Sequence, residues 1–115
     1  MKIAVTSDDK IHIVDHFERA LGFVIFDIEN DVIVGKEHRM NIKKHTGECG
    51  SCDHDAMIDN IKDCDVVISY GMGRRIFTDL SKNNLKAFVT DVNTVDEALQ
   101  RFMKNELENR LDKLH

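Results

Sequence analysis

The residues best suited to chemistry lie in one stretch near the middle of the chain, which reads H-T-G-E-C-G-S-C-D-H from His45 to His54. Within it, Cys49 and Cys52 form a C-x-x-C pair, with a histidine on either side. Thiolate and imidazole are the ligands that soft and borderline metals prefer, and C-x-x-C spacing lets two sulfurs bind one ion from a tight turn. The stretch therefore predicts a metal-binding or metal-cluster-binding loop, although a polar loop with incidental thiols is the alternative.

These residues alone do not determine which metal is bound. Four candidate ligands, His45, Cys49, Cys52 and His54, could close a tetrahedral zinc site. Zinc frameworks usually take pairs of ligands from two separated segments, whereas this loop is a single short segment. The choice is therefore between one zinc ion and a larger metal-sulfur cluster.

Two pairs of basic residues favour an anionic cluster. Lys43 and Lys44 directly precede the loop, and Arg74 and Arg75 follow Gly71-Met72-Gly73, where we expect a strand to give way to a helix. The N-terminus of a helix presents free N–H groups and a positive dipole end, so it attracts anions. On the residues alone, these side chains could equally be solvated surface charges.

Other polar residues have structural explanations. His16 lies at a break before an aromatic strand, where it could be an accessory ligand or, as the residues alone favour, a structural side chain. Cys64 lies on the inward stripe of an expected helix and is interpreted as a small buried hydrophobe. Turn or cap roles explain Asp8, Asp9 and Asp91. The sequence contains no nucleophile elbow, P-loop or H-E-x-x-H motif.

Hydrophobic periodicity predicts the elements that position these residues. An antiparallel beginning followed by helix-strand alternation implies a mixed sheet with right-handed crossovers and helices on one or both faces. Thr94 and Glu97 form a capping box for the last helix. We expect strands over 2–7, 21–28, 32–39, 66–69 and 85–90, a short strand piece at 11–14, helices over 53–63, after 73 and from 94 to 103, and a tail from 105 that extends the last helix or frays.

Composition bounds the class of protein. With 115 residues and 42% hydrophobic residues, the chain has the size of one domain, 1–115. The formal net charge of -5 argues against a nucleic-acid partner. No apolar run reaches the roughly 20 residues of a membrane span, and no signal peptide opens the chain, so we expect a cytoplasmic protein without a membrane partner.

Several segments together carry a resemblance to a known family. They are M-K-I-A-V-T-S-D-D at the start, D-H-F-E-R-A, the His/Cys loop, V-V-I-S-Y-G-M-G-R-R, T-D-V-N-T-V-D-E-A-L and the ending N-R-L-D-K-L-H. As an ensemble, the chain resembles the dinitrogenase iron-molybdenum cofactor biosynthesis family, which includes NifX and NafY-type carriers and the C-terminal domain of NifB. Family members commonly show H-F-G-R-A where this chain has His16-Phe17-Glu18-Arg19-Ala20, so Glu18 replaces a glycine.

The resemblance implies an α/β fold of the ribonuclease H-like type, a mixed five-stranded sheet flanked by helices. It also implies a non-catalytic carrier or chaperone for an iron-sulfur or molybdenum-containing cluster, associated with nitrogen fixation, whose partners are cluster donor and acceptor proteins. It raises His16 to a candidate ligand and places Gly71 to Gly73 on the binding surface.

We therefore expect a cluster carrier in which Cys49 and Cys52 supply thiolates and basic residues neutralise the anion. The metal ligands are expected among His45, Cys49, Cys52 and His54, and the remaining cofactor-binding residues are expected to be His16, Lys44, Gly71, Met72, Gly73 and Arg74. The alternative is a small structural or regulatory module that binds one zinc ion through the same loop. Oligomeric state stays open, because a homodimer could share one cluster between two chains.

Overall fold

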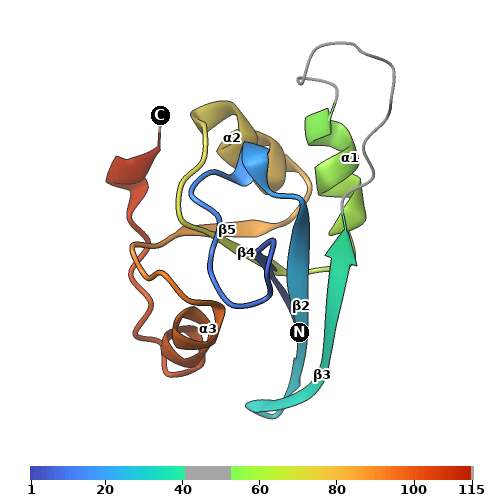
Figure 1. Ribbon diagram of the computed structural model, residues 1–115, viewed down its shortest axis with the longest axis vertical. Coiled ribbons are helices and arrows are strands. Elements are labelled where there is room, and N and C mark those ends of the chain that lie inside the picture. The colour runs from blue at the N-terminus through green and yellow to red at the C-terminus, as the bar shows by residue number, and fades with distance from the viewer. Residues whose placement is uncertain (41–52, 115) are drawn as a thin grey trace.

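A computed structural model of the protein describes residues 1–40 and 53–114 (Figure 1). The strands are β1 (Lys2–Thr6), β2 (Gly22–Glu29), β3 (Val32–Met40), β4 (Val66–Ser69) and β5 (Lys86–Val89). The helices are α1 (Asp53–Asn60), α2 (Arg74–Lys82) and α3 (Val95–Met103), with short 3-10 turns η1 (Phe17–Arg19) and η3 (Leu111–Lys113).

The five strands form one mixed sheet in the order β3-β2-β1-β4-β5. The central strand β1 pairs antiparallel with β2 and parallel with β4, and β4 continues parallel to β5. The hairpin of β2 and β3 has left-handed residues at its turn, Asn30 and Asp31, with φ of 52° and 63°. The predicted mixed five-stranded sheet is confirmed.

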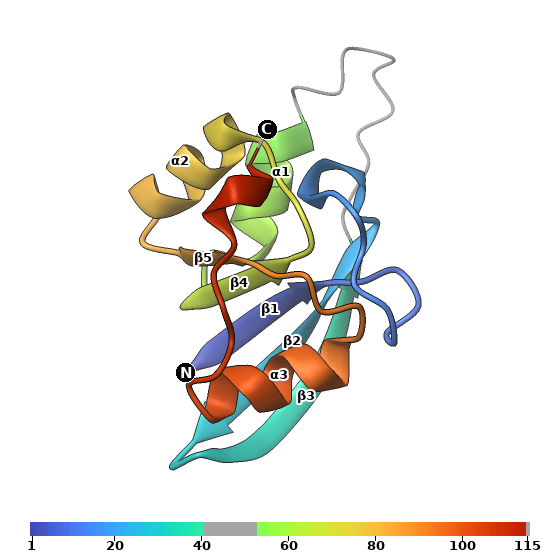
Figure 2. The same ribbon diagram turned by 90° about the vertical axis from the view of Figure 1, so that its left-hand side faces the viewer.

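Helices cover both faces of this sheet, with α1 and α2 on one side and α3 on the other (Figure 2). The division follows from the alternation of side chains along β1, where Ala4 packs with the α1 and α2 side and Ile3 and Val5 pack with the α3 side. Both core clusters are apolar, so each face of the sheet is removed from water by its own helical layer.

Helix α1 ends three residues before the predicted end at 63, and the reason is a competing hydrogen bond. The carbonyl oxygen of Asn60 accepts from Nη1 of Arg39 at 2.9 Å. The backbone N–H of Cys64 then donates to Ile61 at 2.9 Å instead of to Asn60. The chain therefore closes with tight turns after Asn60 rather than with another helical turn.

The C-terminal tail neither extends α3 nor frays along residues 105–114, so that expectation is wrong. Asn105 takes a left-handed conformation with φ of 58°, and Glu106 N–H donates back to the carbonyl oxygen of Arg101 at 2.7 Å, which ends the helix. Asn109 then lies beside β5, donating to the carbonyl oxygen of Ala87 and accepting from the N–H of Val89. The tail thus covers the outer edge of β5.

Two smaller expectations also have clear outcomes. The N-cap of α3 is confirmed, because Thr94 Oγ1 accepts from Glu97 N–H at 3.4 Å, but the Glu97 carboxylate pairs with Arg101 instead of completing the capping box. The strand piece expected at 11–14 is reduced to one isolated bridge between His12 and Thr94.

Candidate functional site

The candidate site lies at the edge of the sheet where the two central parallel strands end. β1 and β4 run in register, with Val5 opposite Ile68, so the segments that follow them lie close together. Thr6, Ser7 and Ser69 are fully buried polar residues at this edge. In open α/β sheets, ligands bind outside the carboxyl ends of parallel strands, so this edge is a candidate ligand-binding site.

The segment after β1 packs tightly on the segment after β4, and His16 lies at their contact. The N–H of Phe17 donates to the carbonyl oxygen of Gly71 at 2.8 Å. A Cβ atom added to Gly71 would lie 2.9 Å from the carbonyl oxygen of Asp15 and 3.6 Å from Nδ1 of His16. Only glycine allows this approach, which sets the half-buried His16 imidazole beside Gly71.

Two buried residues, Phe17 and Ser69, hold this arrangement in place. Phe17 is fully buried and packs on Phe23 with ring centroids 5.7 Å apart, so the residue after His16 is part of the core. On the other segment, Ser69 Oγ donates to the carbonyl oxygen of Gly71 at 2.9 Å. The position of His16 is therefore set by packing and backbone hydrogen bonds.

Helix α2 begins directly after this contact. Gly73 is its N-cap, and no side chain caps the helix. Arg74 and Arg75 are exposed in the first turn, which contains no acidic residue. Positive charges at a helix N-terminus oppose the helix dipole, so these arginines do not stabilise α2 and instead make the end of the helix attractive to anions.

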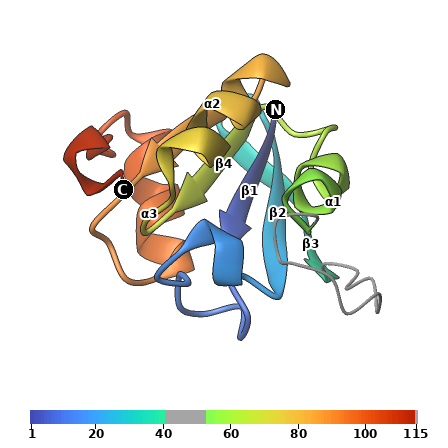
Figure 3. The ribbon, with the colours of Figure 1, turned by 90° about the horizontal axis from the view of Figure 1, so that it is seen from above.

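Met72, between Gly71 and Gly73, is buried in the core, unlike the exposed arginines that follow it. Its side chain is fully buried in the core under α1 and α2, and it forms an isolated bridge with Leu114 of the tail. Seen from above (Figure 3), η1, α1 and α2 all face the viewer, at the end of the molecule that lies at the top of Figure 1. The predicted role of Met72 on a binding surface therefore rests on its backbone.

The predicted metal ligands fall outside the described residues. This applies to His45, Cys49 and Cys52 and to Lys44, and His54 is described only as a backbone position in α1. Within residues 1–40 and 53–114, no three His, Cys, Asp or Glu side chains gather as a metal site. β3, the strand before this segment, ends at the same edge of the sheet as β1, because Met40 pairs with Gly22 and Thr6 pairs with the next residue, Phe23.

The acidic residues near this edge have the turn and cap roles that the sequence predicts. Asp9 accepts hydrogen bonds from the His12 side chain and from the N–H groups of His12 and Ile11, which together hold the pKa of its carboxyl well below the ordinary value. Asp8 accepts from Leu21 N–H at 2.7 Å. The hydrogen bonds of these two carboxylates stabilise the loop after β1.

Residues 1–105 match the family described as "Dinitrogenase iron-molybdenum cofactor". The chain belongs to this family. Membership connects the protein with the binding or biosynthesis of the iron-molybdenum cofactor and with the proteins of that pathway, and the family is associated with cofactor binding and carrying rather than with catalysis.

Solved structures share the fold of this family member over nearly its whole length. The protein PH0822 is 25% identical, with a TM-score of 0.76 over 97% of this chain and 96% of its own. The apo form of the orange protein of Desulfovibrio gigas is 23% identical, with a TM-score of 0.76 over 96% and 92%. The protein MJ0327 of Methanocaldococcus jannaschii is 17% identical, with a TM-score of 0.75 over 96% and 95%. At these identities the last two show the fold alone.

No curated protein sequence matches the chain closely enough to count as a relative. Among the described residues, no helix is long and apolar enough to cross a membrane.

Sequence reasoning missed two groups of residues. Arg39 and Asp63 form an ion pair between β3 and the turn after α1, and their separation of 24 positions gives no signal in the sequence. The sequence pattern did not single out Lys10 and His38, which line a pocket on the sheet. The alternation of β3 could have placed His38 on the same face as its partner Val24.

Proposed function

We propose that the protein carries a metal-sulfur cluster, either iron-sulfur or molybdenum-containing, as cargo between donor and acceptor proteins. The cargo is held at the sheet edge formed by His16, Gly71 and the first turn of α2. Thiolates of Cys49 and Cys52 supply covalent ligands, and His16, His45 or His54 complete the coordination. No bond is made or broken in an organic substrate, so the role is that of a carrier.

The observation that carries this proposal is the tight contact between the His16 and Gly71 segments. The Phe17 to Gly71 hydrogen bond of 2.8 Å and the missing Cβ at Gly71 hold an imidazole at a fixed place beside the start of a helix. A pre-positioned ligand lowers the entropic cost of binding cargo.

Charge supports an anionic cargo. The chain as a whole carries a formal charge of -5, yet Arg74 and Arg75 stand together, exposed, at the positive end of α2. Thiolate-ligated clusters are anionic, and the hydrogen-bond donors and positive charges around them are what the protein contributes to their stability. Lys44 is proposed to add to this charge from the loop.

The donor set decides where the thiolates come from. The described residues contain one cysteine, Cys64, which is 5% exposed, and burial raises the pKa of its thiol to about 11. A thiol of this kind is a poor ligand, because metals bind the thiolate. The chemistry of Cys64 therefore supports our assignment of the thiolate ligands to Cys49 and Cys52.

The test is anaerobic loading of the full chain with iron and sulfide, and in a parallel arm with tetrathiomolybdate. Charge-transfer absorption and metal content per chain are measured for the wild type, for Cys49→Ser/Cys52→Ser and for Cys64→Ala as the matched control. We expect loading by the wild type and by Cys64→Ala and its loss in the double variant. Equal loading by all three proteins would overturn the proposal.

The zinc alternative predicts a different result, which a further arm of this experiment with added zinc measures. A zinc module would bind one equivalent of zinc through the loop and would show no charge-transfer band with iron and sulfide. Size-exclusion chromatography before and after loading also tests whether two chains share the cargo, in which case the elution volume would decrease on loading.

A further inference from the structure

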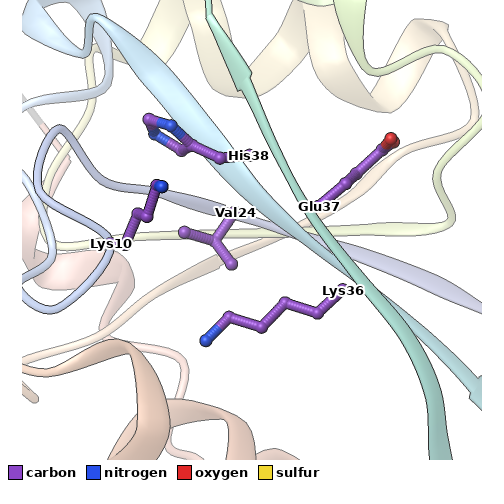
Figure 4. A pocket seen from close by; sticks show the side chains of 5 residues that line it. All are labelled: Lys10, Val24, Lys36, Glu37 and His38. Atoms are coloured by element: carbon purple, nitrogen blue, oxygen red, sulfur yellow. The ribbon is translucent and has the colours of Figure 1, made fainter.

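A pocket lies on the α3 side of the sheet, over the β2-β3 hairpin. It has a volume of about 200 Å³ and is lined by Lys10, Val24, Lys36, Glu37 and His38 (Figure 4). Val24 belongs to the core cluster on the α3 side, whereas Phe17 and Met72 belong to the cluster on the α1 and α2 side. This pocket is therefore separate from the site proposed for the cluster.

Three nitrogen-bearing side chains border this pocket. Lys10 and His38 point toward each other above Val24, and the ammonium group of Lys36 lies on the same side of β3 (Figure 4). The carboxylate of Glu37 points to the other side of the strand (Figure 4). The lining is thus basic over an apolar floor, on a chain that is acidic as a whole.

The loop after β1 fixes Lys10. Its backbone has a φ of 71°, a left-handed conformation that residues with a Cβ rarely adopt. Asp9 holds the loop in this shape by accepting from Ile11 N–H at 2.8 Å and from His12 N–H at 2.7 Å. Lys10 is therefore presented at the tip of a fastened turn and not on a free loop.

The two side chains from β3 are also held in place. The Lys36 ammonium lies 5.6 Å from the centroid of the Phe26 ring, so its stem is fixed along the sheet. His38 Nε2 donates to the carbonyl oxygen of Ser7 at 3.2 Å, which fixes the orientation of its ring at the border of the pocket. The absence of a side chain at Gly22 leaves room for the His38 ring, because a Cβ there would lie 3.2 Å from His38 Nε2.

The volume limits the class of ligand. Pockets for drug-sized organic ligands measure about 300–1,000 Å³, and one water takes about 30 Å³. The 200 Å³ here is below that range and fits a small anion with a few waters. We propose that this pocket binds a small multivalent oxyanion, of which inorganic phosphate is the representative probe.

The test is an NMR titration of the full chain with inorganic phosphate at constant ionic strength. The test variant is Lys36→Gln and the matched control is Lys86→Gln, because the Lys86 ammonium lies over the Phe88 ring at 5.2 Å, far from this pocket on β5. We expect saturable shifts at Lys10, Val24 and His38 in the wild type. Lys36→Gln should weaken binding about tenfold, because a charged donor is lost, and Lys86→Gln should stay within about twofold.

Lys10→Gln is a second test variant on a different element, and we expect it to weaken phosphate binding as Lys36→Gln does. Circular dichroism confirms that each variant is folded. The proposal is overturned if wild-type shifts fail to saturate, or if Lys86→Gln loses as much affinity as Lys36→Gln, since either result would mean unspecific attraction of anions to lysines.

Discussion

Arg39 and Asp63 form a bidentate ion pair, with Nη1–Oδ1 and Nη2–Oδ2 distances of 2.6 and 2.8 Å. Arg39 also donates to the carbonyl oxygen of Asn60, and Lys2 Nζ lies 3.1 Å from the same Asp63 carboxylate. This ion pair joins the end of β3 to the turn after α1. It therefore holds together the two parts of the fold that come before and after the Cys/His segment in the sequence.

Asp63→Asn should lower the free energy of unfolding by about 1–2 kcal/mol. The Arg39 side chain is only 22% exposed and would lose its main charged partner, but the 46% exposure of Asp63 limits the effect by solvent screening. Urea unfolding at neutral pH measures the change. Asp59→Asn is the control, because its pair with Lys62 is well exposed and should contribute less than about 0.5 kcal/mol. Equal losses in both variants would contradict a special role for the Arg39 pair.

The contribution of Asp63 should depend on pH in a defined direction. Hydrogen bonds from Arg39, and further from Lys2, hold the pKa of the Asp63 carboxyl well below its ordinary value. A lowered folded-state pKa stabilises the protein above the unfolded-state pKa of about 3.9, and this stability is lost as the pH falls toward the folded-state value.

The difference in unfolding free energy between wild type and Asp63→Asn should therefore be constant from neutral pH down to about 5 and shrink below about 4. Urea unfolding across this range measures it. A difference that grows on acidification would show that the carboxylate is not the stabilising form.

Gly71→Ala should destabilise the protein by about 1–3 kcal/mol, because the new Cβ forces the two segments of the site apart. The clash is with backbone, the Asp15 carbonyl oxygen at 2.9 Å, so no side chain can move to relieve it. Gly35→Ala is the matched control, since its Cβ would meet the Asp27 side chain at an ordinary 3.5 Å. Thermal unfolding measures both, and a Gly71→Ala protein as stable as Gly35→Ala would contradict the close packing.

Asn109→Ala should expose the edge of β5. The Asn109 side chain accepts from Val89 N–H at 3.0 Å and donates to the carbonyl oxygen of Ala87 at 3.1 Å, in the manner of a neighbouring strand. Hydrogen exchange of the Val89 amide should become faster in the variant, while that of Val67 in the interior strand β4 should change little. Unchanged protection of Val89 would show that the tail does not seal this edge.

The fold was predictable because its signals are local. Alternation along β1 and the spacing of buried residues in α3 report burial directly, and the polar turn between β2 and β3 sets their antiparallel pairing. The end of α1 was not predictable, because it is set by Arg39, a residue on another element that takes over the Asn60 carbonyl. Competition of this kind depends on tertiary contacts.

The candidate site was predictable only in part. The glycines at 71 and 73 and the arginines after them indicate a turn into a helix, and the structure adds that Gly71 contacts the His16 segment. That contact joins residues more than fifty positions apart, which no spacing rule in one sequence can reveal. The roles of His16, Gly71, Gly73 and Arg74 in binding stay predictions, as do those of the residues between 44 and 54.

The central claim is that the cargo is held beside His16 and Gly71. The most direct measurement is paramagnetic broadening of backbone amide signals in the isotopically labelled full chain, loaded anaerobically with iron and sulfide and then reduced. We expect the signals of Asp15 to Phe17 and of Gly71 to Arg74 to broaden, while those of α3 on the opposite face stay sharp. Sharp signals for these two segments in a loaded protein would contradict it.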